Sequence, residues 1–135
     1  MKKNLYLNSI IVCLFCVIFC LSCKQSAKSR LVGKWKLNGK ATIAKMSEET
    51  KKNLGGEKMA EQILGDIKVE YNKDGTYSAS DNETGVWSIS EDEKTLYKTP
   101  KGKKEEKATI VEISGTQFVV SDAPSISSQV YEAIK

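Results

Sequence analysis

The stretch LVGKWKL, residues 31–37, gives the clearest indication of the fold in the sequence. Its residues alternate in character, with two lysines on one parity and the apolar residues Leu31, Gly33, Trp35 and Leu37 on the other. Strict alternation of this kind predicts a half-buried β-strand. Gly33 allows a close approach of backbone, and the side chain of Trp35 buries a large apolar area. We therefore expect a strand here, with Trp35 in the core.

Short β-strands separated by turns continue downstream of the helical segment described below. The expected strands lie at residues 67–71, 76–80, 86–90, 95–99, 108–113 and 117–121. Asp74-Gly75 is a strong hairpin signal, and Pro100 and Gly102 interrupt the longer loop that follows residue 99. About seven strands at regular spacing predict an antiparallel barrel or sandwich.

Three of these segments together resemble a known family. LVGKWKL, KDGTYS (residues 73–78) and GVWSIS (residues 85–90) are similar to the lipocalin-like domains of small bacterial lipoproteins, over about residues 31–121. The resemblance implies a mainly β fold, an antiparallel meander forming a small barrel of about seven to eight strands, with Trp35 at its closed end. True lipocalins cover this tryptophan with an arginine of the last strand. The only arginine here is Arg30, so the chain departs from that pattern.

A helical insert is predicted at about residues 47–65. Ser47 is a suitable N-cap, Gly55-Gly56 interrupts the helix, and Gly65 ends it. One apolar stripe consists of Met59, Ala60, Ile63 and Leu64. We expect two short helices, or one broken helix, that cover an end or a side of the sheet, with Met59 in the core. A second interpretation is a lid over a ligand cavity, hinged at the two glycines.

The C-terminal segment, residues 125–135, allows two structures. Ile126, Val130 and Ile134 are four residues apart, which favours a short helix packed on the barrel. A final strand that closes the barrel is the alternative.

The N-terminal segment contains all four cysteines of the chain, Cys13, Cys16, Cys20 and Cys23. Lys2 and Lys3 precede an apolar run of 12 residues, 10–21, which is shorter than the roughly 20 residues of a spanning helix. Residues 1–22 are therefore predicted to be a signal peptide.

Cys23 is the predicted lipidation site. Ser22 before it and Lys24 after it resemble a bacterial lipobox, although Cys20 stands where that motif usually has leucine. Signal cleavage without lipidation is the alternative. A metal site is disfavoured, because an apolar helix offers no polar second shell. We expect residues 23–30 to be the lipidated cysteine and a flexible tether, and residues 31–135 to be the lipocalin-like domain.

These features predict a location in the bacterial cell envelope. The lipid on Cys23 would bind a membrane, most simply the outer membrane, with the domain facing the periplasm or the cell surface. Removal of Lys2 and Lys3 from the 21 basic residues leaves 19, against 17 acidic ones. That balance argues against a nucleic-acid partner. We expect a monomer, and a solvated loop for the cluster Lys98, Lys101, Lys103, Lys104 and Lys107.

Catalysis is not expected. The chain has no histidine, and no cysteine lies beyond Cys23. Nucleophile motifs, phosphate-binding loops and calcium loops are absent from the sequence, so we predict no catalytic residue, no metal site and no cofactor.

Two functions remain. In the first, the domain binds a small apolar or amphipathic molecule inside the barrel, against the aromatic residues Trp35, Tyr71, Tyr77, Trp87 and Phe118. In the second, the domain has a solid core and acts through surface contacts with another protein, as an inhibitor or an assembly accessory. The first rests on the resemblance, and a fold does not by itself imply a function.

Overall fold

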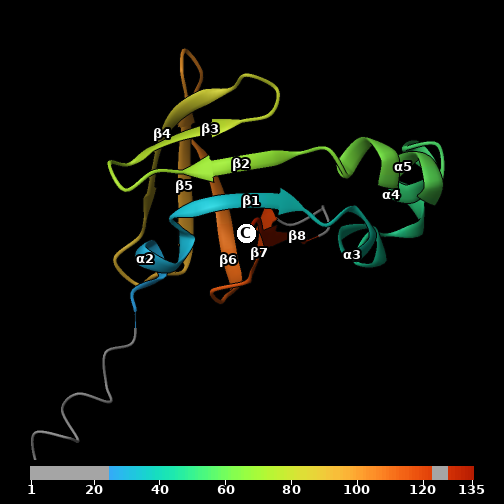
Figure 1. The fold of residues 1–135 in the computed structure, drawn as a ribbon. Coiled ribbons are helices and arrows are strands. Elements are labelled where there is room, and N and C mark those ends of the chain that lie inside the picture. Colours follow the sequence, from blue (N-terminus) through green and yellow to red (C-terminus); the bar gives the residue numbers. More distant parts are fainter. Residues whose placement is uncertain (1–24, 123–127) are drawn as a thin grey trace, which may run out of the picture.

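The computed structural model describes residues 25–122 and 128–135. The predicted signal peptide and Cys23 lie outside these residues. Eight antiparallel strands form a closed barrel, each paired with its neighbour in sequence order (Figure 1). The strands are β1 Gly33–Leu37, β2 Lys68–Tyr71, β3 Thr76–Ala79, β4 Thr84–Ile89, β5 Thr95–Pro100, β6 Glu106–Ile113, β7 Gln117–Asp122 and β8 Gln129–Ala133. The predicted barrel is confirmed, and its closure removes the exposed sheet edges that an open meander would leave.

Local sequence explains the strands and turns. In β1, Trp35 and Leu37 are buried whereas Lys34 and Lys36 are exposed, as the alternation predicted. Gly75 has a φ of +86° in the turn between β2 and β3. The carboxylate of Asp74 accepts a hydrogen bond of 2.9 Å from the backbone N–H of Thr76 and thereby supports this turn.

The C-terminal segment is a strand, so the first-choice prediction of a helix was wrong. β8 pairs with β1 on one side and with β7 on the other. Val130 is buried, but Ile134 lies beyond the strand and is 42% exposed, so the four-residue spacing does not mark one helix face. The backbone of β1 and β7 needs hydrogen-bond partners at this position, and a strand supplies them where a helix would not.

Helix α2 (Ala27–Leu31) covers the end of the barrel at which β1 begins. Ser26 caps the helix, and the N–H of Ala27 donates to a carboxylate oxygen of Glu93 at 2.9 Å. Arg30 donates through Nη1 to the carbonyl of Ile113 at 2.8 Å. Residues 27–30 are therefore helical and packed, contrary to the expected flexible tether.

The core is aromatic and lies inside the barrel. Trp35 and Phe118 meet edge to face with ring centroids 4.8 Å apart, and Phe118 stacks on Tyr131 at 4.5 Å. The surrounding apolar side chains are those of Leu31, Val69, Leu96, Ala108 and Val120. Burial of these side chains is the main favourable contribution to folding. The eight described strands, from Gly33 to Ala133, pair with one another all the way around the barrel, so residues 24–135 include every one of these strands.

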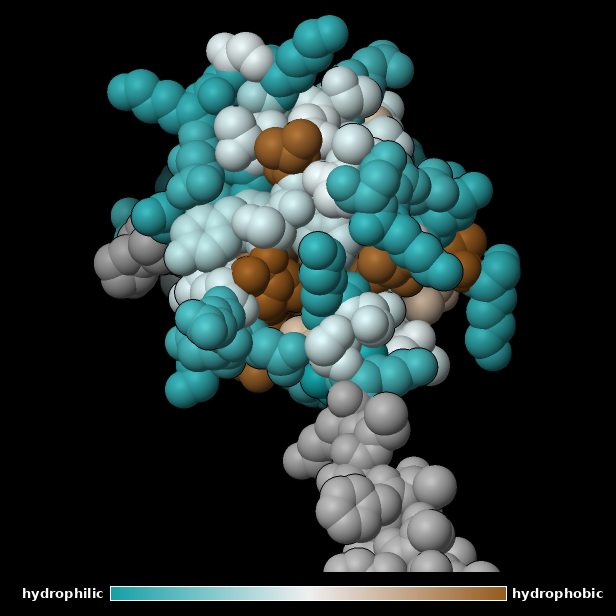
Figure 2. Space-filling view, turned by 90° about the vertical axis from the view of Figure 1, so that its left-hand side faces the viewer, coloured by the Kyte–Doolittle hydropathy of each residue, from teal (hydrophilic) through white to brown (hydrophobic). Residues whose placement is uncertain are grey.

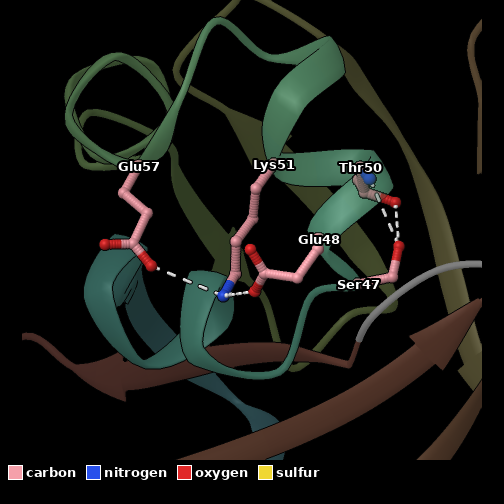
Figure 3. A network of polar contacts seen from close by, with 5 residues as sticks. All are labelled: Ser47, Glu48, Thr50, Lys51 and Glu57. Carbon is pink, nitrogen blue, oxygen red and sulfur yellow. Dashed lines mark hydrogen bonds and ion pairs between the residues drawn. The ribbon is translucent and has the colours of Figure 1, made fainter.

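Three short helices lie at the other end of β1: α3 (Gly39–Ala44), α4 (Glu48–Asn53) and α5 (Glu57–Leu64) (Figure 1). The predicted interruption at Gly55-Gly56 is confirmed, with φ values of +82° and +97°. Figure 3 shows Lys51 between two carboxylates, at 2.7 Å from Glu48 and 3.4 Å from Glu57, so that this lysine joins α4 to α5. In the part of the chain that the structure describes, no helix is long and apolar enough to span a membrane.

The apolar stripe of α5 is only partly buried. Ala60 is fully buried, but Met59 and Ile63 are 56% and 54% exposed, so the prediction of a core methionine was wrong. The helix packs mainly on α3: a Cβ at Gly39 would lie 3.1 Å from the carbonyl oxygen of Glu61. This close approach of two backbones buries the small residue Ala60 and leaves the longer side chains outside.

Candidate functional site

A pocket of about 780 Å³ opens at the end of the barrel opposite α2. Every strand except β4 contributes to its walls, and Ser80, Asp81 and Glu83, between β3 and β4, contribute as well. Met46, Ile63, Leu64 and Ile67, from the helical insert and the segment after it, line one side. The pocket volume lies within the roughly 300–1,000 Å³ that is usual for small-molecule sites.

The barrel wall of the pocket is mostly apolar. It is formed by Leu37, Val69, Tyr71, Tyr77, Ala79, Leu96, Ala108, Val120 and Tyr131. Successive residues of a β-strand point to opposite faces of the sheet, and residues that pair across neighbouring strands share a face. Starting from Trp35 and Leu37, these side chains therefore face inward. Such a surface suits the hydrocarbon part of a ligand.

A hydrogen-bonded group of polar residues lies in the wall near the mouth. Tyr77 donates its hydroxyl to Glu83 at 2.9 Å, and Lys103 donates to the other oxygen of Glu83 at 2.8 Å. The bond from Lys103, followed by that from Tyr77, holds the pKa of Glu83 below its ordinary value. Burial and the bond to Glu83 raise the pKa of Tyr77, so its hydroxyl stays protonated and acts as a donor.

Lys98 lies beside this group. Its ammonium is 5.6 Å from the centroid of the Tyr77 ring and 3.6 Å from a carboxylate oxygen of Glu106. The lysine cluster predicted to be a solvated loop is thus partly paired: Lys98 with Glu106, Lys103 with Glu83, and Lys107 with Glu105.

The five aromatic residues proposed from the sequence form one connected cluster. Ring contacts join Tyr71 to Tyr77, Trp87 and Phe118, and Phe118 to Trp35. Tyr71 and Tyr77 line the pocket, but the other three side chains do not reach its surface and pack behind it. The predicted role of all five residues as ligand contacts stays a prediction.

Sequence reasoning missed much of the pocket. Leu37 shares the inward face with Trp35, as the alternation predicted, but nothing in the sequence showed that it lies at the open end. Tyr131 was missed because its segment was predicted as a helix. Glu83 lies in the turn before β4, Lys98 within β5 and Glu106 at the start of β6, and nothing in these local positions showed that the three side chains meet in a pocket wall.

A metal centre finds no support in the described ranges, 25–122 and 128–135. These residues include no group of three or more histidine, cysteine, aspartate or glutamate side chains placed to hold an ion. The site is therefore described by its shape, its apolar wall and its charged rim.

The chain is similar to one solved structure and to one protein family. The crystal structure of a DUF4847 family protein from Bacteroides vulgatus ATCC 8482 aligns with 12% identity and a TM-score of 0.47, over 78% of this chain and 94% of that one. No curated protein matches the chain. A family profile described as "Lipocalin-like domain" matches residues 31–120, which include the strands from β1 to most of β7. With this match over most of its length, the chain belongs to the lipocalin-like domain family.

Proposed function

We propose that the domain binds a small apolar or amphipathic molecule in the open end of the barrel and does not catalyse a reaction. The observation that carries this proposal is the pocket of about 780 Å³, with an apolar wall and charged groups at its mouth. Folds of this family are suited to holding ligands, and the lining supplies hydrophobic contact together with a few polar groups.

The alternative of a solid core acting through its surface has less support. A barrel filled by its own side chains would leave no space of this size. On the face that Figure 2 shows, the hydrophobic residues form small areas separated by residues of intermediate and low hydropathy. Protein-binding faces are usually larger and continuous. Ile63, an exposed apolar residue elsewhere, is itself part of the pocket lining.

We propose that the domain is anchored in the bacterial envelope by lipid on Cys23. Only residues 24–26 separate Cys23 from the first residue of α2, and three residues span at most about 11 Å. An anchor this short would hold the α2 end of the barrel near the membrane, with the pocket mouth at the far end. Mass spectrometry of the membrane fraction checks the anchor: we expect an acylated N-terminal Cys23, and a Cys23→Ala chain should leave that fraction. An unmodified protein in the soluble periplasm would contradict it.

Native mass spectrometry tests the ligand directly. Residues 24–135, exported to the periplasm of the native host and purified gently, should carry a stoichiometric added mass that is lost on denaturation. The mass identifies the class of the ligand. A clean apo mass, with no change of tryptophan fluorescence when fatty acids are added, would contradict binding and return attention to protein partners of the anchored form.

A further inference from the structure

Equal numbers of positive and negative side chains line the pocket, but these side chains differ in how deeply they are buried. Three lysines and three carboxylates line it, namely Lys68, Lys98, Lys107, Asp81, Glu83 and Glu106. Four of them are exposed, whereas Lys98 and Glu83 are half-buried. Half-buried charges are less screened by solvent, so these two residues have the largest influence on a head group in the pocket.

Both carboxylate oxygens of Glu83 already have a hydrogen-bond donor. Its two oxygens accept hydrogen bonds of 2.9 and 2.8 Å, from Tyr77 and from Lys103. Its side chain is 18% exposed. A cationic ligand at Glu83 would meet a carboxylate whose charge is already paired with the ammonium of Lys103, and would lie beside that ammonium.

Lys98 is engaged more loosely. Glu106 lies 3.6 Å away and is 54% exposed, whereas the side chain of Lys98 is 28% exposed. Exposed ion pairs contribute only about 0–1 kcal/mol. Replacement of Glu106 by a ligand anion would release the Glu106 carboxylate to water at small cost, and Lys98 would keep a negative partner. A ligand cation would instead compete with Lys98 for Glu106 and place a second positive charge beside the half-buried ammonium, which is unfavourable.

We propose that the pocket selects amphipathic anions, with Lys98 as the residue that recognises the anionic head group while the hydrocarbon chain lies against Tyr71, Leu96 and Val120. This inference rests on the proposed function and names the ligand class. The Tyr77 ring beneath the ammonium of Lys98 helps to hold it at the mouth.

Three ligands of equal chain length test it: decanoate, decan-1-ol and decylamine, each titrated by calorimetry into residues 24–135. We expect decanoate to bind about tenfold more tightly than decylamine, with decan-1-ol between them. In the Lys98→Met variant, decanoate should lose about tenfold in affinity and decan-1-ol should be unchanged. The matched control is Lys101→Met, in the turn directly after β5 and outside the pocket lining, which should bind all three as the parent does.

The outcomes separate the two proposals. If none of the three ligands binds, the proposed function fails. If all bind with equal affinity, or if Lys98→Met weakens decan-1-ol as much as decanoate, the pocket binds ligands but Lys98 does not select anions. Tightest binding of decylamine would also overturn the inference.

Discussion

The indole nitrogen of Trp35 donates a hydrogen bond of 2.7 Å to the backbone carbonyl of Leu31. Leu31 is the last residue of α2 and Trp35 is the centre of β1, so this bond joins the covering helix to the barrel. Both side chains are almost completely buried, at 1% and 2% exposure. Trp35 therefore does more than fill the closed end of the barrel, because its indole N–H also has a hydrogen-bond acceptor there.

Replacement of Trp35 by phenylalanine should destabilise the domain by about 2–4 kcal/mol. The variant loses the bond to Leu31 and leaves part of the indole volume empty. Urea denaturation followed by circular dichroism measures the loss. Val86→Ala, at a residue that is 55% exposed, is the control and should change stability by no more than about 0.5 kcal/mol. Equal effects of the two changes would contradict a special role of Trp35.

Gly85 lies where β4 passes close to β5 and to Tyr77. A Cβ there would overlap the carbonyl oxygen of Thr99, and would come within 2.8 Å of Tyr77 Cε1 and 2.9 Å of Pro100 Cα. Gly85→Ala should therefore cost about 2 kcal/mol or more in unfolding free energy, because backbone cannot move aside cheaply. Gly115→Ala provides the comparison: its Cβ would meet no atom within 4 Å, and the change should be nearly neutral. Similar melting temperatures for the two variants would refute this packing.

The hydroxyl of Thr42 accepts a hydrogen bond of 3.0 Å from the backbone N–H of Val130. Thr42 is fully buried in α3, so Thr42→Val keeps the shape and leaves the N–H of β8 without this partner. We expect a loss of about 1–3 kcal/mol. Hydrogen exchange should be faster at Val130 than in the parent protein. Thr109→Val, at an exposed position in β6, should show neither effect; an unchanged Val130 in the first variant would argue against the bond.

The contribution of Glu83 to stability should depend on pH. The hydrogen bond from Lys103, and then that from Tyr77, lower the pKa of Glu83 from its ordinary 4.5 in the folded protein. A carboxyl group with a lowered folded pKa stabilises the fold above its unfolded pKa, and this stability is lost as the pH falls through the folded pKa.

Glu83→Gln should consequently cost about 1 kcal/mol at neutral pH, and the difference from the parent should shrink as the pH drops below 4.5. Urea denaturation of both proteins across this range measures it. A difference that stays constant with pH would show that the charge of Glu83 is not responsible.

Local patterns were sufficient for most of the barrel. The alternation in residues 31–37 and the Asp74-Gly75 turn correctly predicted strand, facing and hairpin, because side-chain direction in a strand depends only on parity. The cap at Ser47 and the break at Gly55-Gly56 were also correct, since capping and left-handed backbone are properties of a few neighbouring residues.

Long-range packing accounts for the failures. Val130 and Ile134 have helical spacing, yet β8 is a strand because β1 and β7 each need a hydrogen-bonding neighbour. Met59 lies on the apolar stripe of α5, yet its side chain is exposed because α5 packs on α3 through Gly39. Arg30 looked like part of a tether, yet the carbonyl of Ile113 and the barrel end hold its helix in place.

By itself, then, the sequence determined the family, the antiparallel meander, the burial of Trp35 and the breaks between elements, all of which depend on residues close together in the chain. Only the tertiary structure decided that the barrel closes through β8, that α2 covers one end, and that Tyr77, Glu83 and Lys98 meet in the wall of a pocket at the other. The reason is physical: closure and pocket formation depend on hydrogen bonds and contacts between residues far apart in sequence, and no local pattern carries that information.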